Sequence, residues 1–360
     1  MMGDLVGNHA GTRQLEHRAH GNIELDALLG GNLGDHALDD FASLNVLGRN
    51  GNERNHDLGA RVDALLDKAG SSRGHGANLH EWQVAKDNGQ AHTAQADGEP
   101  VRIWTAGGDG TFNEALTGAQ GCSLAAVGCL PFGSGNDFLR TYGTREEFND
   151  LDAQLAGGEV DIDLMQTDLG LSATICAAGL DAQVAYGIPQ FRRIPFCGGE
   201  MAYALSIVKQ LCGHIGRNVT FTIDGEELTV DCLMCAVCNG RTYGGGFYAA
   251  PEAQPDDGWL DVFIIRRVSR LTIARLLGMY KSGRHFRNGE LTEQAKPYFI
   301  YRRAKCVSLR PADGRGPIVA TADGECAPCD AITAQLKPLA GRVLLPKPAY
   351  ERFMAQRANV

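Results

Sequence analysis

Apolar and polar positions alternate with glycine-rich turns in the same order twice between residues 101 and 157. Each unit has a short apolar strand, then a glycine loop, then the start of a helix. The strands are Val101–Thr105 and Leu124–Leu130, the loops Gly107–Thr111 and Pro131–Gly135, and the helices begin at Phe112 and Asn136. Two strand–loop–helix units in succession predict a parallel α/β layer, with a ligand site at the carboxyl ends of its strands.

The pattern changes after residue 158, where most apolar segments are short and alternate with polar positions. The clearest predicted strands are Arg217–Ile223, Leu228–Cys238, Trp259–Arg266, Cys306–Leu309 and Ile318–Ala322. Asp-Gly pairs at 224–225, 257–258 and 323–324 supply turn residues. Two helices interrupt the strands, at Gly199–Cys212 and at Ser269–Ser282, with Ser269 as the N-cap. This half is therefore predicted to be a β-rich antiparallel sandwich domain.

These patterns divide the chain into four segments. Residues 81–157 form the α/β domain, residues 158–340 the sandwich domain, and residues 341–360 a C-terminal segment that can return to the first domain. Residues 1–80 differ in composition, because they hold no proline, cysteine, tyrosine or tryptophan but seven of the ten histidines. Two interpretations of this segment stay open: a polar extension, or a stretch that is not the natural coding frame. Neither gives it a function.

Length and charge exclude several classes of protein. A chain of 360 residues allows two or three domains. The net charge of −9 argues against a general nucleic-acid binder. No apolar run reaches the roughly 18 residues needed to cross a bilayer, and no secretory signal is evident. The eleven cysteines are then expected to be reduced thiols of a cytoplasmic protein.

The loop Gly107–Thr111 carries the strongest chemical signal. Three of its first four residues are glycines, which let backbone N–H groups approach an anion closely, and the following helix points its N-terminus at the same place. Asp109 places a carboxylate in this loop. Such a carboxylate repels phosphates unless a cation or a ribose hydroxyl lies between them. From spacing alone, a tight turn capped by Asp109 is also possible. In the second loop, Ser134 can donate to a phosphate, and Asn136 can cap the helix or bind a nucleotide.

Two segments, Gly107–Glu114 (Gly-Gly-Asp-Gly-Thr-Phe-Asn-Glu) and Pro131–Phe138 (Pro-Phe-Gly-Ser-Gly-Asn-Asp-Phe), resemble the signature of the diacylglycerol kinase catalytic family. This family includes soluble bacterial diacylglycerol kinases and sphingosine kinases, and it shares the first motif with NAD kinases. The glycine run Asn239–Pro251, the turn Asp256–Asp261 and Asp323-Gly324-Glu325 follow in the family's order. The resemblance covers residues 101–346.

The resemblance implies ATP-dependent phosphorylation of a lipid hydroxyl, with diacylglycerol as the expected acceptor and phosphatidic acid as the product. It implies nucleotide contacts from Gly107, Gly108, Asp109, Gly110, Thr111, Asn113, Ser134, Asn136 and Asp137. The catalytic base would be Asp323 or Glu325, because an attacking alcohol needs a carboxylate to accept its proton. A structural Mg²⁺ would lie on Asp257, with oxygen ligands around Gln254 and Trp259. A further Mg²⁺ would arrive with ATP.

The chain departs from the family at its beginning. Members start with a strand ending in Asn-Pro-x-x-Gly, whereas this chain has no such motif before Gly107 and no proline before Pro100. The nucleotide-binding domain is therefore expected to lack its first strand. Two alternatives to a diacylglycerol kinase follow: a kinase for another acceptor, such as a sphingoid base or NAD, or a catalytically impaired nucleotide- or lipid-binding homologue.

Two further groups of residues are of types that can bind metal ions. Cys232, Cys235 and Cys238 are spaced as metal ligands can be, but they lie in an apolar strand whose side chains alternate faces, so buried free thiols are expected. His214 and His285 are expected to be surface residues.

A basic stretch marks the second half. Residues 260–310 contain twelve Lys and Arg residues against Asp261, Glu290 and Glu293. A solvated face and a surface that contacts anionic membrane both fit this excess. We expect a lipid substrate, peripheral contact with the inner face of the membrane, no nucleic acid, and a homodimer as a possible assembly.

Overall fold

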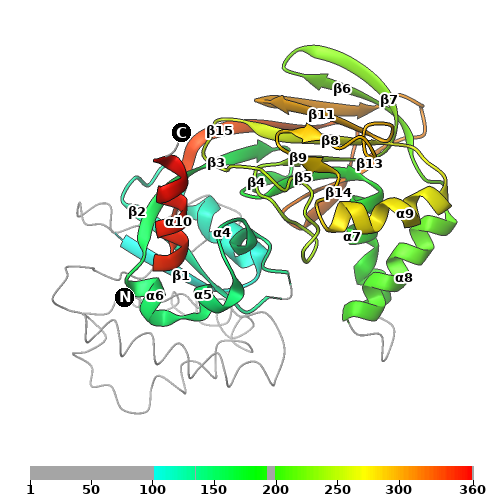
Figure 1. Ribbon diagram of the computed structural model, residues 1–360. Helices are drawn as coiled ribbons and strands as arrows, with labels where there is room; N and C mark the ends of the chain where they lie inside the picture. The colour runs from blue at the N-terminus through cyan, green and yellow to red at the C-terminus, as the bar shows by residue number, and fades with distance from the viewer. Residues whose placement is uncertain (1–100, 134, 193–198, 359–360) are drawn as a thin grey trace, which may run out of the picture.

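The computed structural model describes residues 101–133, 135–192 and 199–358. Its first part is a parallel pair of strands, β1 (Val101–Gly107) and β2 (Ala125–Pro131), joined by helix α4 (Asp109–Ala119). Strand β2 is buried at every position, and β1 is apolar except at Arg102 and Thr105, as strands buried largely on both faces require. Among the described residues β1 pairs only with β2, so the sheet ends there. The predicted parallel α/β layer is confirmed (Figure 1).

Three short helices follow β2, and the first two pack on the same face of the sheet as α4, where Phe138 and Phe148 join Phe112 in one core. They are η3 (Phe138–Thr141), α5 (Arg145–Asn149) and α6 (Leu151–Leu155). Thr144 and Glu147 form a capping box at the start of α5, which satisfies two of its free backbone N–H groups. The buried amide of Gln154 accepts from Trp104 Nε1 at 3.2 Å and donates to the carbonyl of Cys129 at 3.0 Å. This amide fixes α6 to both strands.

The second part is a set of antiparallel strands with a buried apolar interior. Its strands are β3 (Gly158–Thr167), β4 (Gly170–Ser172), β5 (Ile175–Gly179), β6 (Arg217–Ile223), β7 (Glu226–Cys238), β8 (Leu260–Arg266), β11 (Phe299–Ala304), β12 (Cys306–Pro311), β13 (Ile318–Ala322) and β14 (Glu325–Cys329). A small hairpin, β9 (Phe286–Arg287) with β10 (Glu290–Leu291), stands apart from the main sheet. The predicted β-rich domain is therefore confirmed.

Three longer helices cover one end of this domain. They are α7 (Leu180–Arg192), α8 (Gly199–Cys212) and α9 (Arg270–Lys281). The bounds of α8 agree with the prediction. Ser269 is the N-cap of α9, since its side chain accepts from Thr272 N. Helix α7 was not predicted, because its sequence joins an apolar strand without a clear turn between them.

The long strand β15 (Ile332–Leu345) joins the two parts into one sheet. Its first half pairs with β12, and near its end Val343 lies parallel to Val127 of β2. Helix α10 (Lys347–Arg357) then packs against α6 and β3, so the end of the chain lies on the first part (red in Figure 1). The two domains thus share a backbone hydrogen-bond network.

The environment of the singled-out side chains follows from this architecture. Cys232, Cys235 and Cys238 are buried free thiols, as predicted. His214 is exposed, but the prediction for His285 was wrong. His285 is fully buried, stacked on Phe299, with Nε2 at 3.0 Å from the carbonyl of Ala249. No helix among the described residues is long and apolar enough to cross a membrane.

Candidate functional site

The two glycine turns touch each other at the carboxyl ends of β1 and β2. The carbonyl of Gly107 accepts hydrogen bonds from the backbone N–H groups of Phe132 and Gly133, both at 2.9 Å. A Cβ atom on Gly133 would lie 3.0 Å from the nitrogen of Gly108 and would collide with its Cα atom. Only glycine at position 133 allows the turns to close in this way. The close approach brings two sets of backbone N–H groups together.

Asp109 connects the two turns through its side chain. It lies in the first turn of α4, three residues earlier than the predicted start of that helix. Its Oδ1 atom accepts from the backbone nitrogens of Asp137 at 2.6 Å and Phe138 at 3.0 Å. The carboxylate therefore faces the N-termini of α4 and η3, whose partial positive charges favour an anion there.

The other residues predicted for the first turn shape or flank it. Gly110 lies in the first turn of α4, and Thr111 packs against Gly107. Asn113 donates to the carbonyl of Leu171 at 2.8 Å, while its buried Oδ1 atom has no hydrogen-bond partner within the described part of the chain. Asn113 thus keeps one acceptor available.

Asn136 holds the second turn in shape. It is buried in a left-handed conformation with φ of 51°, and its side chain donates to the carbonyl of Gly133 at 2.5 Å and accepts from its nitrogen at 3.1 Å. Asparagine tolerates this conformation better than most residues. The predicted contact from Ser134 lies outside the described residues.

Asp137 connects the second glycine turn to the β-rich domain. Its Oδ2 atom accepts from Gly245 N at 2.7 Å, and its carbonyl accepts from the hydroxyl of Thr242 at 2.9 Å. Burial raises the pKa of Asp137 to about 6, with a further contribution from the charge of Asp109. The glycine run of the second domain is therefore held on the second glycine turn.

The run at residues 239–246 reaches this position through its own backbone. Gly244, Gly245 and Gly246 all have positive φ, at 61°, 82° and 108°, a conformation that few other residues adopt readily. Asn239 anchors the start of the run by donating to the carbonyls of Asp163 at 2.7 Å and Ala173 at 2.8 Å. The run thus turns back toward β2 immediately after β7.

Asp323 lies at the predicted Asp-Gly-Glu turn between β13 and β14. Its carboxylate accepts from the backbone nitrogens of Ala173 at 2.6 Å, Thr174 at 3.2 Å and Ile175 at 2.9 Å. Burial raises the pKa of Asp323 to about 6 despite these hydrogen bonds, and the charge of Asp109 adds to the effect. Glu325 follows at the exposed start of β14.

The three aspartates Asp109, Asp137 and Asp323 therefore share one electrostatic environment. The charge of Asp109 raises the pKa of Asp137 and the pKa of Asp323, so its field reaches both of the other carboxylates. Carboxylate oxygens are the ligands that Mg²⁺ prefers, and a cation between them would relieve their repulsion. A Mg²⁺ ion that accompanies a bound phosphate chain would take a carboxylate oxygen from Asp109 or Asp137, since the oxygens of Asp323 already accept backbone N–H groups and the described residues hold no group of three side chains that could bind a metal ion by themselves.

The second predicted cation site does not have a fitting set of donors. Asp257 forms an ion pair with Arg303, and its Oδ1 atom accepts from the nitrogen of Trp259 at 3.0 Å. Gln254 contributes its carbonyl to the nitrogen of Asp257 at 3.4 Å. With a guanidinium already on the carboxylate, a cation at Asp257 would meet like charge. In the described ranges no group of three acidic, histidine or cysteine side chains forms a metal cluster.

Sequence reasoning missed two buried carboxylates near the site. Asp163, on β3, accepts from Gly258 N at 2.7 Å and Leu339 N at 2.8 Å, and so ties the Asp-Asp-Gly turn to β15. Asp181, at the start of α7, accepts from the hydroxyl of Tyr243 at 3.1 Å, and burial raises its pKa to about 7. The signal at Asp181 was a single acidic residue inside an apolar segment, whereas Asp163 shares its strand with Glu159 and Asp161 and does not stand out in the sequence.

Comparison with known proteins finds matching protein families and relatives for both parts of the chain. Residues 48–167 match the diacylglycerol kinase catalytic domain, and residues 174–345 match the YegS C-terminal NAD kinase beta sandwich-like domain. A Stenotrophomonas maltophilia protein described as "Probable lipid kinase YegS-like" is 30% identical over 302 residues, covering 80% of this chain and 92% of that protein. The chain belongs to the diacylglycerol kinase catalytic family. It is therefore a lipid kinase by descent.

Other family members agree with this assignment. The diacylglycerol kinase of Mycobacterium tuberculosis is 29% identical over 276 residues, covering 69% of this chain and 87% of that protein. The fold matches that of a Bacillus anthracis protein assigned as a diacylglycerol kinase, with a TM-score of 0.51 at 19% identity over 69% of this chain and 79% of that one. The kinase-domain match begins at residue 48, inside the segment whose composition sets it apart. Family membership implies ATP as the phosphate donor.

Proposed function

We propose that this lipid kinase transfers the γ-phosphoryl group of ATP to the hydroxyl of diacylglycerol and produces phosphatidic acid for phospholipid metabolism. The observation that carries the proposal is the convergence of both glycine turns, the 239–246 run and the Asp-Gly-Glu turn around Asp109 and Asp137. Phosphoryl transfer needs this combination of positioned phosphates, a neutralising cation and a carboxylate near the acceptor.

The glycine turns would hold the phosphates through backbone N–H groups. Gly107 ends β1 and Gly108 is the N-cap of α4, where main-chain donors and the helix dipole both favour an anion. A Mg²⁺ ion held near Asp109 and Asp137 would neutralise charge on the phosphate chain. Asn113, with a buried acceptor still available, would contribute to the same site.

Glu325 is the better candidate for the base, and a second copy of the turn supports this choice. The part of the chain that the structure describes contains the sequence Asp-Gly-Glu twice, at residues 224–226 and 323–325, each in a hairpin turn between paired strands. The two aspartates have similar φ values, 47° and 42°. Asp224 uses its carboxylate to accept from the backbone nitrogens of Lys305 and Cys306.

Asp323 therefore does what its counterpart does, which is to anchor the hairpin to a neighbouring backbone segment. Its oxygens already accept three N–H donors, which makes it a positioning residue in our proposal. In this proposal Glu325, exposed at the start of β14, accepts the proton of the lipid hydroxyl as that oxygen attacks the γ-phosphate. We place Asp323 in support of Glu325 and not in contact with the substrate.

Two other functions stay as alternatives. A different acceptor, such as a sphingoid base or NAD, would use the same phosphate site, and the first motif is shared with NAD kinases. The run at 239–251 favours a lipid over NAD. A catalytically impaired nucleotide- or lipid-binding homologue is favoured by the absence of an Asn-Pro-x-x-Gly motif before Gly107. This homologue would bind ATP without transferring phosphate.

The deciding experiment measures transfer of labelled γ-phosphate from ATP to diacylglycerol in mixed micelles with Mg²⁺. Glu325→Gln should lower kcat by about 10²- to 10⁴-fold, as loss of a general base does, while ATP binding persists. Glu226→Gln is the matched control, because Glu226 occupies the same place in the other Asp-Gly-Glu hairpin. Full activity of Glu325→Gln would remove it as the base. Phosphate transfer to a sphingoid base or to NAD, without transfer to diacylglycerol, would show that the acceptor differs from the one proposed.

We also propose that the enzyme reaches its substrate by docking α8 and α9 on an anionic membrane surface. Helix α8 exposes Met201, Leu205 and Val208 at spacings of four and three, with exposed fractions of 56%, 38% and 57%. Leu271 of α9 is 84% exposed. Such a face, flanked by basic side chains, is typical of helices that lie in a membrane interface.

A hydrogen-bonded junction joins these two helices at the end of the molecule away from α10 (Figure 1). Arg270 donates to the carbonyls of Leu211 at 2.6 Å and Gly213 at 2.7 Å. The Nη1 atom of Arg267 lies 3.6 Å from the Oδ2 atom of Asp231. These two arginines of the basic stretch thus have structural partners, whereas Arg275 is exposed on α9. Apolar side chains and Arg275 together would make the contact.

A further inference from the structure

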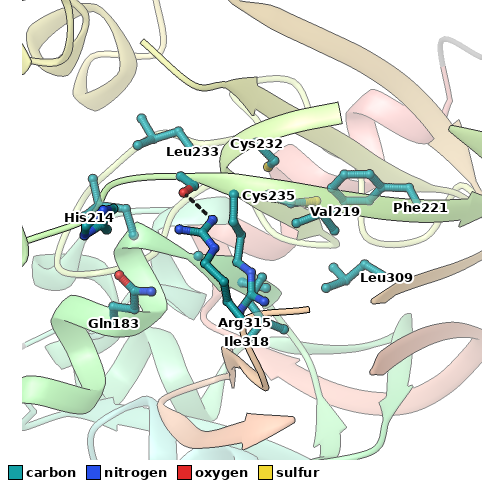
Figure 2. A pocket seen from close by; sticks show the side chains of 15 residues that line it. Gln183, His214, Val219, Phe221, Cys232, Leu233, Cys235, Leu309, Arg315 and Ile318 are labelled. Carbon is teal, nitrogen blue, oxygen red and sulfur yellow. Dashed lines mark hydrogen bonds between the residues drawn. The ribbon is translucent and has the colours of Figure 1, made fainter. Parts of the chain in front are cut away.

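A cavity of about 160 Å³ lies inside the β-rich domain, between β5, β6, β7, β12 and the start of α7. Its inner wall is apolar and buried. The wall consists of Val219, Phe221, Leu233, Cys235, Leu309 and Ile318. Figure 2 shows Phe221, Val219 and Leu309 on one side of the cavity and His214, Gln183 and Arg315 on the other. The cavity is thus apolar within and polar at its rim.

The rim carries an excess of positive charge. Arg217 and Arg315 both bind the carboxylate of Asp313, so two guanidinium groups share one counter-charge. Arg217 holds the pKa of Asp313 well below its usual range, so this carboxylate stays ionised. Arg315 also donates to the carbonyl of Gly216 at 3.1 Å, which turns its side chain across the opening. His214 is exposed beside it. One uncompensated cation therefore remains at the mouth.

The size and place of the cavity exclude a whole diacyl lipid as its occupant. A closed apolar cavity of about 150 Å³ holds a molecule the size of benzene. This one therefore has room for one alkyl segment. Ile318 begins β13 and Asp323 follows its other end, five residues on. At roughly 3.3 Å per residue, the cavity lies about 16 Å from the reactive turn.

We propose that this cavity is a binding site for the single alkyl chain of a free fatty acid, with the carboxylate at Arg315. The chain would replace empty space against Phe221 and Leu309, and burial of each CH₂ group favours binding. A carboxylate at the rim would give the second guanidinium its own counter-charge. This site is separate from the phosphate site and does not depend on the reaction proposed above.

Calorimetric titration of the full chain with decanoate, kept below its micellar concentration, tests the proposal without any activity measurement. We expect saturable binding of one decanoate per chain, and about tenfold weaker binding of decanol, because a charge-assisted hydrogen bond is lost. Arg315→Gln should weaken the binding of decanoate by a similar factor and leave the binding of decanol unchanged. Arg310→Gln is the matched control, since Arg310 is an exposed arginine on β12 that pairs with Glu227 outside the cavity.

A second variant tests the apolar part independently. Cys235→Leu adds bulk to the cavity wall and should weaken the binding of decanoate and of decanol alike. If Cys235→Leu does not fold, decanoate binding by the Arg315 and Arg310 variants still tests the proposal. Equal binding of decanoate by Arg315→Gln and the natural chain, or no saturable binding at all, would overturn the proposal. Displacement of decanoate by dioctanoylglycerol would also overturn it, because the cavity would then belong to the substrate.

Discussion

Single carboxylates in this protein perform distinct tasks that their partners define. Asp109 binds the backbone of the second glycine turn, Asp137 binds Gly245 across the domain boundary, and Asp323 binds three amides of the segment before β5. None of these contacts uses another side chain as the donor. Each aspartate therefore fixes a piece of main chain, and together they set the shape of the site. Glu325, on an exposed position, is the one that we assign to the reaction.

The first prediction separates positioning from catalysis at Asp323. Asp323→Asn keeps the side-chain shape and tolerates the positive φ, but it replaces one of the two acceptor oxygens by an NH₂ group, which cannot accept from the backbone N–H groups that face it. We expect a loss of about 2–4 kcal/mol in the free energy of unfolding, measured in urea. Asp224→Asn, in the matching turn, should cost a similar amount. Only Asp323→Asn should also lower kcat with KM for ATP unchanged; equal kcat in both variants would contradict its positioning role.

The second prediction concerns pH. The folded pKa of Asp137 is about 6 against an ordinary value of 3.8, so the folded protein holds this proton more tightly than the unfolded chain. The resulting stability is present below pH 3.8 and is lost as pH rises to about 6. Urea unfolding between pH 4 and 7 should show a decline of at most about 3 kcal/mol from this group.

Asp137→Asn is the test of that assignment. The amide keeps an acceptor for Gly245 N but cannot ionise, so the variant should lose stability less steeply over the same pH range. Asp323 and Asp181, whose pKa values are also raised, will leave a residual slope. Identical slopes in the variant and the natural chain would show that Asp137 does not titrate in this window.

At the scale of elements, the sequence predicted what local pattern controls. The strands of the parallel pair, the helix at 199–212 and the Asp-Gly hairpins all follow from apolar period and turn residues. Local pattern could not show that the two glycine turns touch, because their contact depends on parallel pairing of β1 with β2. It also could not place His285, whose partners Phe299 and Ala249 are 14 and 36 residues away. Long-range packing decided both.

The third prediction tests the contact between the glycine turns. Gly133→Ala would place a Cβ atom against Gly108, and the turns would have to separate. We expect a loss of about 1–3 kcal/mol in stability and about tenfold weaker ATP binding, measured by calorimetry. Gly278→Ala, in α9 away from the site, is the control, because a Cβ atom there meets nothing within 4 Å. ATP binding that is equally affected in both variants would argue against a specific role for the close approach.

On the scale of the whole molecule, β15 makes one sheet out of two domains. Backbone hydrogen bonds continue from β1 through β2 and β15 to the antiparallel strands. The sequence suggested two domains but not this continuity, because a single strand of 14 residues serves both. Asp163 adds a second tie by holding Leu339 at the irregular point of β15. The proposed phosphate site thus lies at a junction held by main chain, while the helices with exposed apolar residues lie at the far end.

That separation leads to the last prediction, on membrane docking. Leu205→Glu combined with Val208→Glu places two charges on the exposed face of α8, and each lost apolar contact is worth about 1 kcal/mol when half buried in the interface. Sedimentation with anionic phosphatidylglycerol vesicles should show binding weakened about tenfold or more, since these losses add. Arg275→Glu should weaken it further and make it less sensitive to salt.

Met354→Glu provides the control for this experiment. Met354 is an exposed apolar residue, 43% accessible, on α10 at the opposite end of the molecule. Its replacement should leave vesicle binding unchanged, because that end would not touch the lipid. With diacylglycerol in the vesicles, the α8 variant should lose activity while its activity on a short-chain, dispersed diacylglycerol persists. Equal vesicle binding by the α8 variant and the natural chain would place the membrane contact elsewhere on the protein. Misfolding would not explain that result, because the substituted side chains are exposed and their change leaves the core intact.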